Sequence, residues 1–335
     1  MRIDRRRPAA RAAPAAIGAT LAMGLVAAAV AHAAAAAAAA DADVYVPVDQ
    51  PTHITAIAGV IAAGARWQVV FSSVELQDGI IGAPDGGVLI AMQENDVIRE
   101  IAPDGVSTIY LGGTKGAGAL AMGNGGALFA VHRKEPTFLS QLLPDRRVIA
   151  PTAAGPASLG RISDLVADLK GGFYLTGASF YYVDPRGALT VLAPGINTNG
   201  IALSPDGNTL YVTNTTEVIA FDVPADGMPR NQRVFATLGD TRADGMAVDA
   251  EGRVYVPGVK GIHVLSPQGR ELGVIPTARR ATSLAFAGRD KKMLYMLAVG
   301  ANRTDGTMLD MQAGPNGRTL YRLPMLTAGF RGRPK

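Results

Sequence analysis

The feature that most constrains this chain is a phrase that recurs about every 40 residues. Each copy contains a short apolar run, a turn rich in Gly, Asp, Pro or Asn, and a second apolar run. The turns are APDGG (83–87), GNGGA (123–127), DLKGG (168–172), SPDGN (204–208), DAEGR (249–253) and AGRDK (287–291). A repeat of this length is typical of a propeller or a solenoid.

A second class of turn lies between those six and indicates the number of strands. These turns are APDG (102–105), LPDR (143–146), DPRG (184–187), PADG (224–227), SPQG (266–269) and GPNG (314–317). Two turns per period, between runs rich in Val, Ile, Tyr and Leu, predict about four short strands per repeat. The chain is therefore predicted to be all-β, with residues 51–335 forming a six-bladed β-propeller of four-stranded blades. The run 66–74 is expected to close the ring against the last blade.

Residues 1–33 have the features of an export signal. A basic start, MRIDRRRPAAR, precedes the apolar run AAIGATLAMGLVAAAVA, and AHA at 31–33 resembles a cleavage site. The alanine-rich linker at 34–50 carries no basic stop-transfer residue, which favours cleavage over retention as a membrane anchor. The mature protein is expected to be periplasmic or secreted, without membrane attachment.

Composition narrows the classes of partner and metal. The chain has 32 basic and 28 acidic residues, and residues 1–33 contain five and one of these, which leaves 27 of each. A balanced charge gives no support for nucleic-acid binding. The absence of cysteine excludes disulfides and cysteine-bound zinc. The three remaining histidines, His53, His132 and His263, are far apart in sequence, which argues against a histidine-bound zinc site.

One position in each repeat, eight residues before the turn glycine, is expected to lie at a mouth of the central channel. The innermost strand of each blade begins there, so the equivalent residues of all blades should converge. These ring positions are Asp78, Gly118, Ser163, Asn199, Asp244 and Ser283. Five of the six carry side-chain oxygens, two are carboxylates and none is a cation.

Oxygen-rich rings of this kind suit a hard divalent cation such as Ca²⁺. The lack of sulfur and imidazole favours Ca²⁺ or Mg²⁺ over Zn²⁺. Two carboxylates in a confined mouth repel each other, and a bound cation would offset that repulsion. The alternative is that a wet channel mouth selects polar side chains without any metal.

The stretches ELQDGIIGAPDGG, INTNGIALSPDGNTLYVTN, ADGMAVDAEGRVYV and ATSLAFAGRDKKMLYML resemble the senescence marker protein, gluconolactonase and luciferin-regenerating-enzyme family, the regucalcin-like propellers. The resemblance covers nearly all of the chain after the signal. It implies a six-bladed propeller that opens sugar or related lactones with one divalent metal at the channel mouth. It also implies metal ligands at Asp78, Asn199 and Asp244, with Ca²⁺ favoured and Mg²⁺, Mn²⁺ and Zn²⁺ as alternatives.

The same resemblance implies the remaining roles. Asp244 would also act as the general base, and Ser163, Asp164 and Ser283 would contact a small-molecule lactone or ester. The family has Glu where Asp78 stands, and Asn where Ser163 and Ser283 stand. Each change keeps an oxygen but shortens the side chain's reach or weakens it as a ligand.

The leading expectation is thus a metal-dependent hydrolase, a lactonase. The alternative from another class is a non-catalytic exported propeller that binds a ligand or a protein partner through one face, since a fold does not specify a function. Aryl-ester or phosphotriester hydrolysis and lyase chemistry are further enzyme alternatives. The absence of a G-x-S-x-G phrase argues against a serine nucleophile, and the sequence indicates no oligomeric state.

Overall fold

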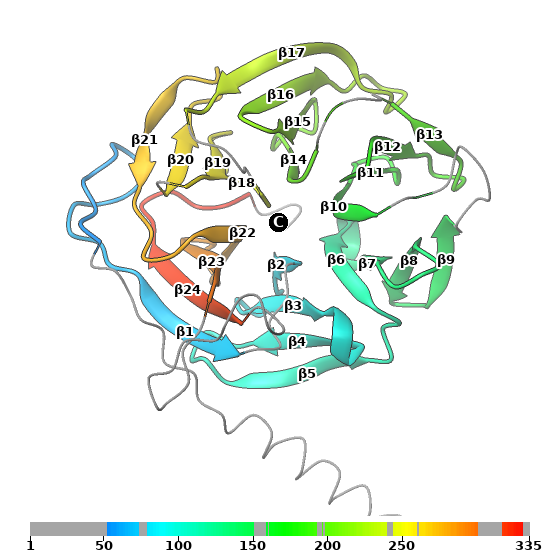
Figure 1. Ribbon diagram of the computed structural model, residues 1–335, viewed down its shortest axis with the longest axis horizontal. Helices are drawn as coiled ribbons and strands as arrows, with labels where there is room; N and C mark the ends of the chain where they lie inside the picture. The colour runs from blue at the N-terminus through cyan, green and yellow to red at the C-terminus, as the bar shows by residue number, and fades with distance from the viewer. Residues whose placement is uncertain are drawn as a thin grey trace, which may run out of the picture. The chain divides into compact units, whose positions relative to one another are not determined.

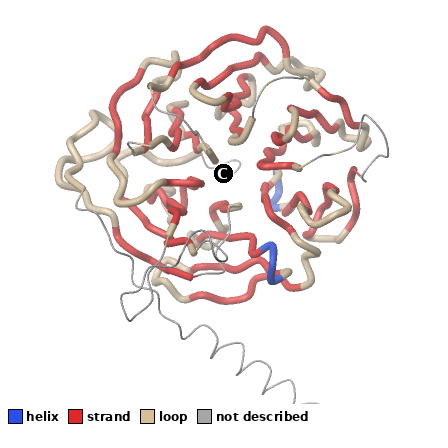
Figure 2. Tube along the Cα trace, viewed as in Figure 1, coloured by secondary structure: helices blue, strands red, loops and turns tan. Residues whose placement is uncertain are grey.

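The computed structural model describes residues 52–73, 79–150, 159, 161–192, 196, 198–239, 244–259, 261–300 and 317–330. Within these residues six antiparallel four-stranded sheets are arranged radially around one axis, as Figures 1 and 2 show. The predicted six-bladed propeller is confirmed. Residues 1–51 lie outside the described part, so the export signal stays a prediction. No helix among the described residues has the length and apolar character needed to span a bilayer.

Each blade is formed by four strands that follow one another in sequence, except in the last. Blade 1 contains β2 (Ile80–Gly82), β3 (Val88–Met92), β4 (Val97–Ile101) and β5 (Ser107–Gly112), and blade 2 contains β6 (Ala117–Met122), β7 (Leu128–His132), β8 (Phe138–Leu143) and β9 (Arg147–Ala150). Blade 3 contains β10 (Ile162–Ala167), β11 (Phe173–Gly177), β12 (Phe180–Val183) and β13 (Leu189–Val191), and blade 4 contains β14 (Ile201–Leu203), β15 (Thr209–Asn214), β16 (Glu217–Asp222) and β17 (Arg230–Thr237). Blade 5 contains β18 (Ala247–Val248), β19 (Val254–Pro257), β20 (Ile262–Leu265) and β21 (Glu271–Ile275). Two short 3₁₀ turns, η1 (Gln93–Asn95) and η2 (Asn124–Gly126), lie beside β3 and β7.

Blade 6 closes the ring with strands from both ends of the described chain. Its inner strands are β22 (Ala281–Ala287), β23 (Met293–Val299) and β24 (Arg318–Pro324), and its outermost strand is β1 (Gln68–Ser73). Strand β1 pairs antiparallel with β24, and Figure 1 shows it beside β24 at the rim. The closure predicted for the run 66–74 is therefore confirmed.

The core lies between adjacent blades, which explains why the strands have continuous apolar runs. In β3, Val88, Ile90 and Met92 belong to the cluster shared with blade 6. The alternate residues Leu89 and Ala91 belong to the cluster shared with blade 2. Because successive side chains point to opposite faces of a strand, a strand covered on both faces needs apolar residues at every position.

The repeated turns use one backbone geometry in which glycine is favoured. In APDGG, Gly86 has φ +103°, and the carboxylate of Asp85 accepts a hydrogen bond from the backbone N–H of Gly87 at 2.9 Å. The last repeat has Lys291 at the turn-glycine position, and Lys291 also adopts a positive φ, +60°. The sixth copy therefore keeps the turn geometry although it lacks the glycine.

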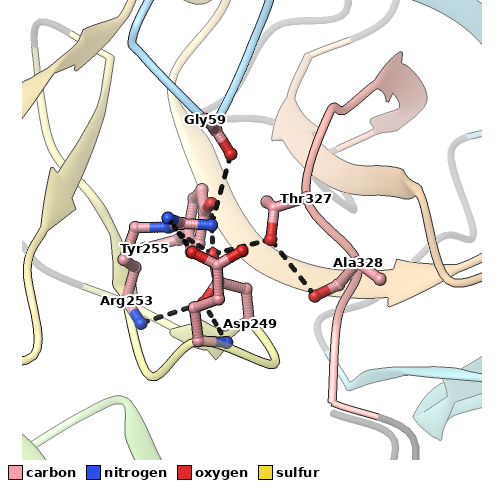
Figure 3. Close-up of polar contacts among 7 residues, drawn as sticks. Gly59, Asp249, Arg253, Tyr255, Thr327 and Ala328 are labelled. Atoms are coloured by element: carbon pink, nitrogen blue, oxygen red, sulfur yellow. Dashed lines mark hydrogen bonds and ion pairs between the residues drawn. The ribbon is translucent and has the colours of Figure 1, made fainter.

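A buried polar network, drawn in Figure 3, ties both ends of the described chain to blade 5. The carboxylate of Asp249 is fully buried and accepts hydrogen bonds from Arg253, Tyr255 and Thr327. Arg253 also donates to the carbonyl of Gly59, which lies in the segment before β1, at 3.3 Å. Thr327 lies after β24, so Asp249 and Arg253 together connect three segments that are distant in sequence.

Candidate functional site

A cavity of about 600 Å³ opens at the end of the propeller where several inner strands begin. Its walls come from blades 1 to 6 and carry many polar side chains. The lining residues are Gln93, Arg133, Glu135, Thr137, Arg161, Ile162, Ser163, Asn199, Asp244, Arg280, Thr282 and Arg318.

Three of the predicted site residues line this cavity together. Ser163 is the second residue of β10, Asn199 lies just before β14, and Asp244 lies before β18. All three are partly exposed to solvent. Asp78, the predicted third metal ligand, lies outside the described residues. Ser163, Asn199 and Asp244 therefore converge on one cavity, and their catalytic and ligand roles stay predictions.

The Asn-Gly and Asp-Gly phrases have a packing reason for their glycines. A Cβ on Gly79 would lie 2.7 Å from the carbonyl oxygen of Gly118, the ring position of the next blade. A Cβ on Gly200 would overlap the carbonyl oxygen of Asp244, and one on Gly245 would overlap the hydroxyl of Ser283. Each glycine therefore lets the entry of one inner strand approach the entry of the next.

Gly200→Ala is accordingly expected to destabilise the fold by about 1–3 kcal/mol, because the backbone at Asp244 must shift to accommodate the methyl group. It should also lower any activity that depends on Asp244. Thermal unfolding of the variant measures the first effect. The control is Gly112→Ala in β5, where an added Cβ meets nothing within 4 Å and the expected change is within about 0.5 kcal/mol. Equal stability of the two variants would contradict the packing argument.

Asn199 is positioned by neighbours in blades 3 and 4. The hydroxyl of Thr213, on β15, accepts hydrogen bonds from the backbone N–H groups of Asn199 at 3.2 Å and Gly200 at 2.9 Å. The hydroxyl of Thr176, on β11, donates to the carbonyl of Asn199. These bonds hold the main chain of Asn199 and leave its amide side chain at the cavity wall.

Asp164 lies behind the wall rather than among the lining residues. Its side chain is 9% exposed, and its carboxylate accepts hydrogen bonds from the N–H of Leu165 at 2.9 Å and of Ile201 at 3.4 Å. Ile201 belongs to blade 4, so this carboxylate joins the inner strands of two blades. The structure gives Asp164 a bracing contact, and its predicted contact with substrate stays a prediction.

In blade 6 the structure moves the cavity-facing position by one residue. Strands β6, β10 and β22 each contain an irregularity in their pairing with the next strand. At that point the register skips one residue, called here the bypassed residue, which is Gly118, Ser163 or Thr282 respectively. Thr282 lines the cavity, whereas Ser283 does not and instead lies against Gly245. The eight-residue offset selects Ser283 because β22 and β23 form one more regular pair between the turn and the irregularity than the corresponding strands of blades 2 and 3 do.

The cavity also contains charge that the ring positions do not predict. Four arginines line it, Arg133, Arg161, Arg280 and Arg318, against two described carboxylates, Glu135 and Asp244. The ring positions carry no cation. Arg161 and Arg280 lie just before the innermost strands β10 and β22, Arg133 follows β7, and Arg318 begins β24. The sequence contained one indication of Arg133: Gly118 is the ring position without a side chain, which leaves space at the cavity for a side chain from elsewhere. A Cβ at Gly118 would overlap the side chain of Arg133.

The donors at the cavity fit a divalent cation that prefers oxygen ligands. Asn199 offers an amide oxygen, Asp244 a carboxylate and Ser163 a hydroxyl, and no imidazole or thiolate is among the lining residues. Across the described residues no three His, Cys, Asp or Glu side chains are grouped as in a typical metal site. A site here would therefore depend on Asn199 as a ligand, and on residues beyond the described set such as Asp78.

His132, one of the three histidines after residue 33, is not among the residues that line this cavity. Its ring is buried and stacks on Phe138 with centroids 3.8 Å apart. Nδ1 lies 3.1 Å from the carbonyl oxygen of Lys115 and so carries the hydrogen, which leaves Nε2 to accept from the hydroxyl of Ser140 at 2.6 Å. Burial lowers the pKa of His132. Both ring nitrogens are thus satisfied within the fold of blade 2.

Comparison with known sequences identifies relatives of this chain. A model of the SMP-30/Gluconolactonase/LRE-like region matches residues 114–300, more than half of the 335 residues. The chain is similar to a 6-deoxy-6-sulfogluconolactonase of Pseudomonas putida, with 32% identity over 143 residues that cover 40% of this chain and 49% of that protein. Matches of this kind span between 30% and 56% of the length of the curated relatives.

Solved structures share the fold across most of the chain. A gluconolactonase from Xanthomonas campestris has a TM-score of 0.66 at 21% identity, covering 84% of this chain and 96% of that one. A protein described as calcium-binding, regucalcin from Agrobacterium tumefaciens, has a TM-score of 0.59 at 20% identity, covering 80% and 98%. At these identities the likeness concerns the fold.

Proposed function

Because the chain belongs to the SMP-30/Gluconolactonase/LRE-like family, we propose that the mature protein hydrolyses a sugar lactone or a related lactone at the mouth of its channel. The observation that carries this proposal is the meeting of Ser163, Asn199 and Asp244 in one cavity of about 600 Å³. A cavity of that size accommodates a small ligand, since such sites are typically about 300–1,000 Å³.

A divalent cation, with Ca²⁺ favoured, is part of the proposal. Asn199 and Asp244 would hold it, with Asp78 as the expected third ligand. The oxygen-only donors support this choice, as does the fold shared with a calcium-binding relative. When bound, such a cation polarises the lactone carbonyl and lowers the pKa of a coordinated water.

The protein's own side chains supply proton transfer and substrate binding in this proposal. Asp244 accepts a proton on a carboxylate oxygen as the water oxygen forms its bond to the carbonyl carbon. The ring C–O bond then breaks, and the proton passes to the departing alkoxide, so the product is a hydroxy acid. Ser163, on blade 3, would bind a ring hydroxyl. The hydroxyl of Thr282 donates to the carbonyl of Leu297 at 3.2 Å. Asp164 and Ser283 brace the strands behind the cavity wall.

The test is hydrolysis of a panel of sugar and aliphatic lactones by the mature protein, with the spontaneous rate subtracted. We expect turnover to disappear after chelation and to return with Ca²⁺, or with Mg²⁺, Mn²⁺ or Zn²⁺ if one of those is the physiological ion. Turnover that persists without metal would contradict the cation. The absence of any turnover from folded protein, with every ion supplied, would instead favour a non-catalytic propeller that binds a ligand or protein partner.

A further inference from the structure

We propose that the substrate is an anionic lactone, one that carries a carboxylate, phosphate or sulfonate besides its lactone ring, and that Arg161 and Arg280 bind this group. The inference rests on the proposed hydrolysis and names the substrate class for the same cavity. It begins from the charge of the lining. Four guanidinium groups face two described carboxylates, so the described lining carries an excess of positive charge.

This excess is local, because the chain after residue 33 has equal numbers of basic and acidic residues. Like charges in one partly enclosed cavity repel each other, and the low-dielectric walls strengthen that repulsion relative to open water. A divalent cation at Asn199 and Asp244 would add to the positive charge. A ligand that brings negative charge offsets both, and the field of such a cavity also attracts an anion from solution.

Arg161 and Arg280 occupy equivalent places in two blades. Each lies two residues before the bypassed residue of its inner strand, which is Ser163 in blade 3 and Thr282 in blade 6. The blades succeed one another around the axis in Figure 1, so the order along this arc of the mouth is Arg161, Asn199, Asp244 and Arg280. The proposed catalytic pair is therefore flanked by one arginine on each side.

The four arginines differ in whether their side chains make hydrogen bonds to the protein. Arg133 donates to the carbonyl of Ser163, and Arg318 donates to the carbonyl of Gly317 at 3.4 Å. The guanidinium groups of these two arginines are therefore bonded to the protein backbone. Arg161 and Arg280 are exposed, and among the described residues neither side chain has a hydrogen-bond or ion-pair partner. Their guanidinium groups are thus available to a ligand.

The chemistry of guanidinium indicates which class of ligand would bind. Its planar set of N–H donors pairs with the oxygens of carboxylate, phosphate or sulfonate, often through two parallel bonds. Hydrolysis creates a second carboxylate at the opened ring. Two available arginines, one on each side of Asp244, match a substrate with one anionic group and a product with two.

The test compares D-galactono-1,4-lactone with D-galactaro-1,4-lactone, which differ in having a hydroxymethyl group or a carboxylate at carbon 6, and adds 6-phosphogluconolactone as the phosphate case. We expect the anionic lactones to have the higher kcat/KM, and added salt to reduce that preference. Arg161→Gln and Arg280→Gln should each lower kcat/KM for the anionic lactones by about 10- to 100-fold, as expected for losing a charged hydrogen bond. The neutral lactone should lose less than about threefold.

Arg186→Gln, in an exposed turn of blade 3 away from the cavity, is the matched control and should change neither substrate. Equal kcat/KM for both kinds of lactone, or arginine variants that lose as much on the neutral lactone as on the anionic ones, would overturn the anionic substrate while leaving lactone hydrolysis intact. Calorimetric binding of galactarate, compared with galactonate, separates the two proposals. Binding of galactarate that depends on Arg161 or Arg280, without turnover of any lactone, would overturn hydrolysis and support the anion site.

Discussion

Asp244→Asn is expected to lower kcat for lactone hydrolysis by about a thousandfold or more and to leave the propeller folded. A positioned general base contributes about 10²–10⁴-fold, and the amide also removes the negative charge that would help hold a divalent cation. Asparagine has nearly the same shape, and the contact between Gly200 and residue 244 involves the backbone carbonyl, so the ring of inner strands is retained. Single-turnover and steady-state rates, with melting temperature as the folding check, measure the effect.

The matched control is Glu135→Gln, which removes the other described carboxylate of the same cavity. Glu135 lies in the loop between β7 and β8 and is not one of the ring positions of the inner strands. Its loss should change kcat by less than about tenfold, since no proton transfer is assigned to it. Comparable losses in both variants would mean that overall cavity charge, and not the position of Asp244, governs the rate.

Asp249→Ala is expected to cause the largest loss of stability among single substitutions discussed here, about 3–5 kcal/mol, as for breaking a buried ion pair. The fully buried carboxylate accepts from the backbone N–H groups of Glu251 and Arg253, from Arg253 Nε at 2.7 Å, and from the hydroxyls of Tyr255 and Thr327. Burial and this carboxylate raise the pKa of Tyr255, which keeps its hydroxyl protonated as a donor. Alanine leaves these donors without their acceptor and removes the buried one of the two carboxylates that pair with Arg253, the other being the exposed Glu251.

The measurement is the free energy of unfolding from urea titration where refolding is reversible, and otherwise the melting temperature at one scan rate. Asp104→Ala is the control, because Asp104 holds an analogous turn with its bond to the N–H of Val106 at 3.1 Å but is exposed. That variant should lose about 0.5–1 kcal/mol. If Asp249→Ala costs no more than Asp104→Ala, the network that joins Gly59 and Thr327 to blade 5 contributes little to closure.

The two substitutions also separate catalysis from stability. Asp244→Asn should affect rate without affecting unfolding, whereas Asp249→Ala should affect unfolding without changing kcat per folded molecule. Asp244 and Asp249 are only five residues apart in sequence. Asp244 lies before β18 at the cavity, and Asp249 lies after β18 in the core.

The sequence by itself determined the architecture, because a propeller blade is a local structure. The turns at 83–87 and 249–253 are specified by a few adjacent residues, and each lies between strands that pair with their neighbours in sequence. Even Lys291, which departs from the glycine pattern, takes the conformation that its place in the repeat predicts. Asn199 and Asp244 were found in the same way, since equal offsets within equal repeats converge on one axis.

Tertiary structure decided what stands around those residues. The irregularity in β22 brings Thr282 rather than Ser283 to the cavity, and strand pairing, not local composition, sets its place. Arg161 and Arg280 come from blades 3 and 6, more than a hundred residues apart, and Asp164 is used to join two blades. Side-chain direction and contact across blades depend on packing and register, which a pattern of residue types along one chain does not encode.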